Sequence, residues 1–337
     1  MFLCTVRLCA AQALKLKDWL MITMFCTPKP FRDHIAVIQR NALRSWKLLD
    51  PNIEVILFGD DEGASEVCQE LGLRHERQVL RTEHGTKRLD SIFSSAQQSA
   101  KYDTLCYVNC DIILTHEFLA AQQRLEGWRH QYLMVGRRWD LDITEPLDFS
   151  APGWQQEIIE RTKAEGIERF YHNIDYFLFP RSLYSEIPGL VIGRIWWDHW
   201  LVGKAYERGA AVVDVSEVVY AVHQNHDYGY NRRGIEGVWG DEEAESNYRL
   251  ASQDTKLRTI EDAPYRLTPR GIEENRFYWL APTKRRFRKV RRKVRSVCRT
   301  NIWHPFLNMT RPLRHSLGLR RSPELKSGKD RKHWMDV

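Results

Sequence analysis

The stretch "CYVNCDIIL", residues 106–114, places two polar side chains inside an apolar run. Such a run is typical of a strand buried on both faces of a sheet. Asn109 and Asp111 alternate with Cys110, so both point to the same face of an extended backbone. Because an unpaired carboxylate is costly to bury, the triplet is expected either to bind a divalent cation or to accept hydrogen bonds from a neighbouring turn.

Strands and helices alternate on both sides of this stretch. Short apolar runs at 21–25 and 54–58 predict strands, and apolar residues at helical spacing predict helices at about 35–46, 64–73 and 89–100. This order predicts an α/β, Rossmann-like fold with a mostly parallel sheet flanked by helices. The polar loops at 27–30, 59–61 and 109–111 should then converge at the carboxyl ends of the strands, where such sheets bind ligands.

The second half of the chain adds further elements. Apolar runs predict strands at 131–135, 175–179 and 210–215, and periodic apolar residues predict helices at 154–164 and 197–207. The chain is therefore divided into four parts: an N-terminal extension (1–20), one catalytic domain (21–250), a connecting segment (251–283) and a basic, helical C-terminal tail (284–337).

Charge is distributed unevenly along the 337 residues. The net charge is +7, but the segment from residue 284 carries 18 Lys and Arg against three acidic residues, so the preceding 283 residues are net negative by 8. Within 284–307, Phe287, Val290, Val294 and Val297 recur at helical spacing among basic residues. This pattern predicts a helix lying on an anionic membrane surface; a solvated tail and a nucleic-acid contact are the alternatives.

Cysteine usage and hydropathy bear on the compartment. The seven cysteines form no CxxC pair, which favours a reducing compartment, and no apolar run reaches 18 residues. We expect a cytoplasmic protein, peripheral on the inner face of a membrane if the tail binds there.

The order of "TPKPF" (27–31), "FGD" (58–60) and "YVNCDIIL" (107–114) resembles the GT-A glycosyltransferases, described as nucleotide-diphospho-sugar transferases, over residues 21–250. The resemblance implies a hexosyltransferase-like enzyme that moves a sugar from a nucleoside diphosphate sugar to a hydroxyl of a glycan or glycolipid. It also implies a D-x-D element that grips Mn²⁺ or Mg²⁺ on the diphosphate. Asn109 replaces the first Asp here; a literal D-x-D lies at Asp140–Asp142, but Asp111 fits the family order better.

The resemblance further implies that a downstream histidine completes the metal site. His223 and His226 lie in "AVHQNHDYGY" (221–230), and His223 is the better candidate because it is closer to the apolar run. A hydrogen-bonded polar turn is the alternative. Neutral imidazole is a common metal ligand.

Asp198, in "WWDHW" (196–200), matches the acidic general base of inverting members of this family. Its neighbouring tryptophans suit stacking on a sugar ring. The structural alternative is that Asp198 only complements the dipole of the helix that it begins.

The expected donor contacts lie on several loops. Thr27, Pro28 and Asp60 would hold the base and ribose. Gly85, Thr86 and Arg88 would add contacts at a helix start, and Asp175 would accept hydrogen bonds from sugar hydroxyls. Arg137 and Arg138 would neutralise phosphate, unless they pair with that carboxylate instead.

Two rival functions remain open. A metal-dependent phosphohydrolase or nuclease could use Asp111, Asp142, His223 and His226. A non-catalytic nucleic-acid-binding protein could rely on the basic tail.

Overall fold

The computed structural model describes residues 21–227, 234–276, 278–280 and 282–283. The predicted N-terminal extension (1–20) and the basic tail (284–337), with its expected membrane helix, lie outside the described residues. The chain divides into two compact units, Met1–Arg276 and Phe277–Val337. In the second unit, a short 3₁₀ helix, η2, spans Tyr278–Leu280.

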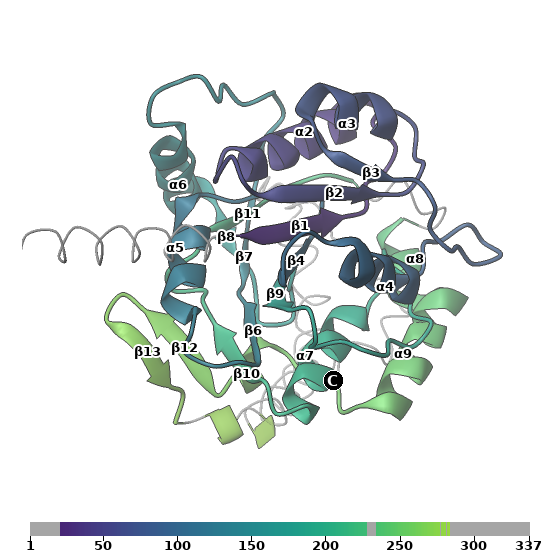
Figure 1. The fold of residues 1–337 in the computed structure, drawn as a ribbon, viewed down its shortest axis with the longest axis vertical. Coiled ribbons are helices and arrows are strands. Elements are labelled where there is room, and N and C mark those ends of the chain that lie inside the picture. The colour runs from purple at the N-terminus through teal and green to yellow at the C-terminus, as the bar shows by residue number, and fades with distance from the viewer. Residues whose placement is uncertain (1–20, 228–233, 277, 281, 284–337) are drawn as a thin grey trace, which may run out of the picture. The chain divides into compact units, whose positions relative to one another are not determined.

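A nine-stranded sheet forms the centre of the first unit (Figure 1). Its order is β13-β12-β10-β6-β9-β4-β1-β2-β3. Strands β4, β1, β2 and β3 are mutually parallel, and β9 pairs antiparallel with β4 on one side and β6 on the other. Their bounds are β1 Ile22–Cys26, β2 Glu54–Phe58, β3 Arg74–Glu76, β4 Thr104–Val108, β6 Tyr132–Val135, β9 Tyr176–Pro180, β10 Ala211–Asp214, β12 Tyr265–Thr268 and β13 Gly271–Glu274.

A second sheet of four short strands has the order β5-β11-β7-β8. Strand β11 pairs antiparallel with β5 and parallel with β7, and β7 pairs antiparallel with β8. The strands span Ile112–Ile113 (β5), Arg138–Leu141 (β7), Ile167–Glu168 (β8) and Ala221–Gln224 (β11). Strand β11 of this sheet carries His223, while Asp111 directly precedes β5 and His226 follows β11.

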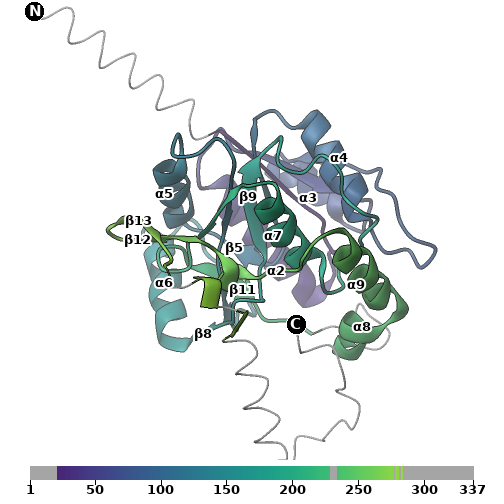
Figure 2. The same cartoon turned by 90° about the horizontal axis from the view of Figure 1, so that it is seen from below.

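Helices cover both faces of the large sheet (Figures 1 and 2). On one face α2, α3 and α5 pack against alternate strand residues, and on the other α4 and α7 do so. Helix α7 also packs against α9. The helices span Asp33–Lys47 (α2), Ala64–Leu71 (α3), Leu89–Ser99 (α4), His116–Leu125 (α5), Trp154–Glu165 (α6), Trp197–Glu207 (α7), Ile235–Gly240 (α8) and Glu242–Asp254 (α9), with a 3₁₀ turn η1 at Ile260–Asp262.

The α4/α7 face is built from aromatic rings. Phe25 of β1 lies 5.0 Å from Phe93 of α4 and 5.5 Å from Tyr107 of β4, ring centre to ring centre. Trp197 of α7 lies 5.3 Å from Tyr107. Burying each such side chain stabilises the fold by about 1.5–3 kcal/mol, which fixes β1 and β4 beneath their helices.

The predicted α/β class and mostly parallel sheet are confirmed. The single strand expected at 106–114 is wrong: the run divides into β4 and β5 at a turn in which the Ile112 N–H donates to the Asn109 carbonyl at 3.1 Å, so Asn109 and Asp111 do not share one extended strand. The other predicted strands and helices are present, with ends that differ by at most a few residues. The small sheet was not predicted, since β5 and β8 have two residues each and β7 carries the charged run "RWDL". Among the described helices, none is long and apolar enough to cross a bilayer.

Candidate functional site

The site lies where the chain order in the large sheet reverses. From β1 the chain proceeds outward through β2 and β3, and then returns to form β4 on the other side of β1. The loops after β1 and β4 therefore meet: Lys29 Nζ lies 3.8 Å from Asp111 Oδ2. This is the kind of switch point at which open α/β sheets bind ligands.

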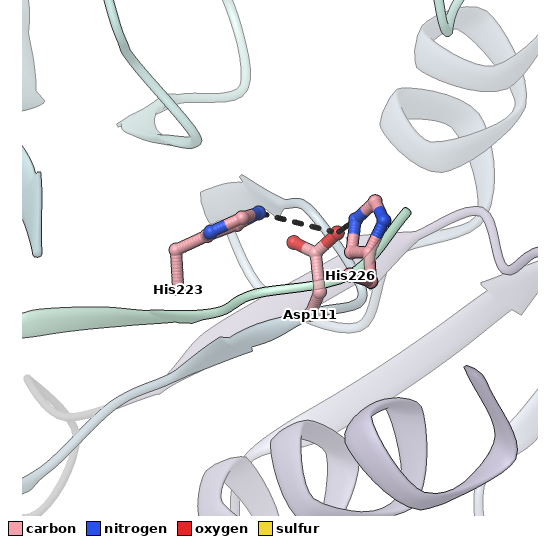
Figure 3. A group of neighbouring side chains, drawn as sticks. All are labelled: Asp111, His223 and His226. Carbon is pink, nitrogen blue, oxygen red and sulfur yellow. Dashed lines mark hydrogen bonds and ion pairs between the residues drawn. The ribbon is translucent and has the colours of Figure 1, made fainter. Parts of the chain in front are cut away.

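Asp111, His223 and His226 converge at this point (Figure 3). Each offers one ligand atom, and these three atoms lie within 4.8 Å of one another. His226 Nε2 is 3.2 Å and His223 Nε2 is 4.0 Å from Asp111 Oδ2. The three side chains are largely buried, with exposed fractions of 13%, 7% and 4% for Asp111, His223 and His226. The prediction that Asp111 and these histidines come together is therefore met in the geometry.

Strand register holds this group in place. His223 lies in β11 and pairs with Ile112 of β5, the residue after Asp111. The carbonyl oxygen of Asp111 accepts hydrogen bonds from the backbone N–H and the side chain of Gln224, at 3.2 and 3.1 Å. Trp46 of α2 donates to the Ile112 carbonyl at 2.8 Å. Asp111 and His223 thus rest on paired backbone.

The electrostatics favour an ionised Asp111. Burial alone would raise the pKa of its carboxyl, but the neighbouring His226, His223 and Lys29 side chains outweigh burial and lower the pKa well below the ordinary value. Burial also lowers the pKa of Lys29, partly offset by Asp111. The carboxylate is therefore available as a ligand at neutral pH.

The residues fit a divalent cation. Asp111 Oδ1 is buried and has no hydrogen-bond partner among the described residues. His226 Nδ1 contacts the carbonyl oxygen of Asp227, which can only accept, so a neutral ring carries its proton there and keeps a lone pair on Nε2. Because two imidazoles and one carboxylate are softer than an all-oxygen set, the group suits Mn²⁺ better than Mg²⁺.

Asn109 has a different role from a substitute metal ligand. Its side-chain amide donates to Asp175 Oδ1 at 2.5 Å, and its backbone N–H donates to the Asp175 carbonyl at 2.9 Å. Asp175 Oδ2 accepts from Arg138 at 2.9 Å. An amide is needed here because a second carboxylate would repel that of Asp175. Arg138 and Asp175 thus pair with each other, the alternative considered for them.

The literal D-x-D is split between two environments. Asp140 is buried and pairs with Arg138 at 2.9 Å and Arg169 at 2.6 Å. Asp142 is exposed and accepts a hydrogen bond from Asn225 at 2.7 Å. Asp140 does not belong to the three-residue group, and neither does Asp142. Of the two motifs considered, only the one containing Asp111 contributes to the group of potential ligands found among the described residues.

Asp198 lies in the first turn of α7. Burial raises the pKa of its carboxyl, opposed by His199 and reinforced by the negative charge of Asp175. Trp196, at the N-cap, has a φ of 87°, unusual for a bulky residue. Trp197 is buried and packs against Tyr107 and Phe177 of the aromatic core. A buried carboxyl with a raised pKa is a candidate proton acceptor.

Lys87 joins the loops expected to hold the nucleotide. Its Nζ donates to Thr27 Oγ1 at 3.0 Å and to the Pro28 carbonyl at 2.6 Å, and it forms an ion pair with Asp61. The chain passes close by only because residue 59 is glycine: with φ at +111°, a Cβ there would lie 2.9 Å from Lys87 Cε. Thr27 and Pro28 are thereby brought beside the end of β2, as predicted.

The other predicted donor residues make contacts of their own. Asp60 pairs with Arg81 at 2.8 Å, and the hydrogen bond lowers its pKa. Thr86 donates to Glu243 at 2.6 Å, and Arg88 pairs with Asp90 at 2.5 Å. The other two predicted donor residues also contact other parts of the protein: Gly85 forms a turn with Thr82, and Arg137 pairs with Glu168 at 2.7 Å. None of these residues belongs to the group of potential metal ligands formed by Asp111, His223 and His226.

Sequence reasoning missed Lys29 and Lys87, and it considered Asp140 only as part of an alternative metal motif. Lys29 stands inside the quoted "TPKPF", and Lys87 stands between two residues that were chosen. A lysine beside strand-end loops was the available signal for both. For Asp140 the signal was its place in the D-x-D pattern, which indicated the right region and a different role.

Comparison with known proteins gives structural similarities alone: no family model matches the chain, and no curated protein matches its sequence. The chain is similar in structure to solved glycosyltransferases. One is S. aureus TarS 1-349 in complex with UDP-GlcNAc, with a TM-score of 0.46 and 12% identity over 72% of this chain and 70% of that chain. A second is the mannosyltransferase PcManGT from Pyrobaculum calidifontis in complex with GDP-Man and Mn²⁺, with a TM-score of 0.43 and 12% identity over 70% and 65% of the two chains.

A third similar structure is described as a nucleotide-diphospho-sugar transferase from Desulfovibrio desulfuricans G20. Its TM-score is 0.37 and its identity 13%, over 69% of this chain and 97% of that chain. We rest the functional proposal on the side chains of the site rather than on these similarities.

Proposed function

We propose that this protein is a metal-dependent glycosyltransferase that moves a sugar from a nucleoside diphosphate sugar to a hydroxyl acceptor. One observation carries the proposal: a largely buried carboxylate and two imidazoles converge at the β1/β4 switch point, and Asp111 Oδ1 has no hydrogen-bond partner in the part of the chain that the structure describes. A divalent cation held there by Asp111, His223 and His226 would neutralise the charge that develops on a diphosphate leaving group.

The chain's own residues would do the rest. The Thr27–Lys29 loop and the Asp60–Asp61 turn, joined by Lys87, would bind the nucleoside. Lys29, 3.0 Å from His226 Nε2, would place a positive charge beside the diphosphate. Asp198 would accept the proton of the attacking hydroxyl, since burial raises the pKa of its carboxyl toward that of a useful base.

The geometry favours this reaction over the rival hydrolase. A hydrolase built on Asp111, Asp142 and the two histidines needs Asp142 at the cation, but Asp142 is exposed and bonded to Asn225. Within the described residues, a single group of three potential His, Cys, Asp or Glu ligands occurs. A two-metal mechanism therefore has no second site there.

The test is turnover of a panel of UDP- and GDP-sugars by the full chain with Mn²⁺, measured as release of nucleoside diphosphate. We expect Mn²⁺-dependent release, lost in Asp111→Asn and kept in Asp142→Asn, the exposed control. Asp111-dependent cleavage of DNA or of a phosphomonoester, with no binding of any nucleotide sugar, would refute the proposal.

Several finer assignments remain predictions. They are the hexosyl group, a glycan or glycolipid acceptor, Mn²⁺ as the resident cation, the division of the chain at residues 250 and 283, and a cytoplasmic location. Binding of residues 284–307 to an anionic membrane is a prediction of the same kind, made from sequence outside the described residues.

A further inference from the structure

We infer that Asp140 is a positioning residue that holds the His223 ring with its proton on Nδ1 and its lone pair on Nε2, ready for the cation. The inference deepens the proposed function and rests on its cation site. It gives the D-x-D carboxylate a role other than that of a metal ligand.

Strand pairing places the two side chains together. In the parallel β7/β11 pair, Asp140 lies opposite His223, as Ile112 does on the other side of β11. Strand register therefore places Asp140 beside His223, and Asp111 directly precedes β5 on the other side of β11.

The distances from the two His223 nitrogens to the neighbouring carboxylates support this role of Asp140. His223 Nδ1 lies 3.2 Å from Asp140 Oδ1, while its Nε2 is directed at Asp111 Oδ2, 4.0 Å away. Nδ1 is buried and has no other hydrogen-bond acceptor among the described residues, so the Asp140 carboxylate, 3.2 Å away, is the acceptor available to its proton. A carboxylate that accepts the distal N–H of a metal-bound histidine fixes the tautomer and the ring orientation.

Asp140 is itself fixed and charged. Its carboxylate is 5% exposed and pairs with Arg138 and Arg169. His226 obtains the equivalent support from the Asp227 carbonyl, so each imidazole has its own acceptor on Nδ1.

The test uses Asp140→Asn, with Asp142→Asn as the matched control from the same motif. Mn²⁺ binding to the full-length protein, followed by calorimetry without any sugar, should weaken by about 10–100-fold in Asp140→Asn and by less than threefold in Asp142→Asn. The metal-free His223 ring, followed by nitrogen NMR and assigned with His223→Gln, should shift from the Nδ1–H toward the Nε2–H tautomer in Asp140→Asn alone.

A second variant separates positioning from simple loss of charge. Asp140→Asn combined with Arg169→Gln restores the local charge balance and removes the arginine left unpaired, so it also serves if the single variant folds poorly. We expect its Mn²⁺ affinity to stay low. Recovery of affinity in the double variant, or an unchanged tautomer in Asp140→Asn, would overturn the inference.

These results do not depend on glycosyl transfer. Weak Mn²⁺ binding by Asp140→Asn with no transfer by the wild-type protein would leave the positioning role standing and remove the proposed function. Wild-type Mn²⁺ affinity in Asp140→Asn together with active transfer would do the reverse.

Discussion

Replacing Asp198 by Asn tests the proposed general base most directly. The change removes one charge and keeps the shape of a side chain that is 18% exposed. A general base contributes about 10²–10⁴ in rate, which at about 1.4 kcal/mol per tenfold corresponds to about 3–5.5 kcal/mol of transition-state stabilisation. We expect kcat to fall by this factor, with little change in the binding of Mn²⁺ or of the donor.

Stability should change in the direction opposite to that of a purely structural role. A carboxyl whose pKa is raised by burial disfavours the folded state when ionised, so Asp198→Asn should unfold at equal or higher denaturant concentration at pH 7. That advantage should shrink as the pH falls toward about 3.9, the pKa of aspartate in the unfolded state, and it should disappear below that pH, where the carboxyl is protonated in both states. If Asp198 only served the helix dipole, the same variant would lose about 0.3–1 kcal/mol.

The assay is nucleoside diphosphate release across a range of pH, alongside urea unfolding of both proteins. Because the pKa of Asp198 is raised, the acidic limb of the wild-type kcat profile should lie above that of an ordinary aspartate. Asp33→Asn is the control, since Asp33 is an exposed residue in the first turn of α2. A kcat within threefold of wild type for Asp198→Asn, with lower stability, would show that the carboxylate has a structural role.

Two further substitutions test how the site and its scaffold are built. Asn109→Asp would set a second carboxylate against Asp175 and remove the amide donor. We expect the free energy of unfolding to fall by about 1–3 kcal/mol at pH 7, with a smaller loss toward pH 4 and no tighter Mn²⁺ binding. Higher stability with tighter Mn²⁺ binding would instead indicate that residue 109 is a metal ligand. Gly203→Ala should lower the free energy of unfolding by about 1–3 kcal/mol, measured with urea, because the new Cβ would lie 2.3 Å from the Lys256 carbonyl oxygen. Gly240→Ala is the control: open space surrounds Gly240, so this change should be neutral or stabilising. Equal effects of the two changes would contradict the close contact between Gly203 and Lys256.

Local patterns predicted most of the large sheet. The runs "MITMF" and "EVILF" are buried on both faces, so apolar continuity identifies them as strands without further information. Helices such as α4 carry the 3.6-residue spacing that one buried face requires. Strands β5, β7 and β8 have no such pattern, because β5 and β8 have two residues each and β7 carries the charged run "RWDL".

The sequence by itself determined the α/β class and the polar ends of β1, β2 and β4, since these follow from periodicity and residue chemistry. Its resemblance to the GT-A glycosyltransferases added Asp111, His223 and His226 as candidate ligands. Only the tertiary structure decided that Asn109 serves Asp175, that Asp140 faces His223, and that Lys29 and Lys87 join the strand-end loops. The physical reason is that these roles are pairwise distances, between 2.5 and 3.8 Å, set by strand register among segments up to 197 residues apart in the chain. A pattern of neighbouring residues does not encode that register.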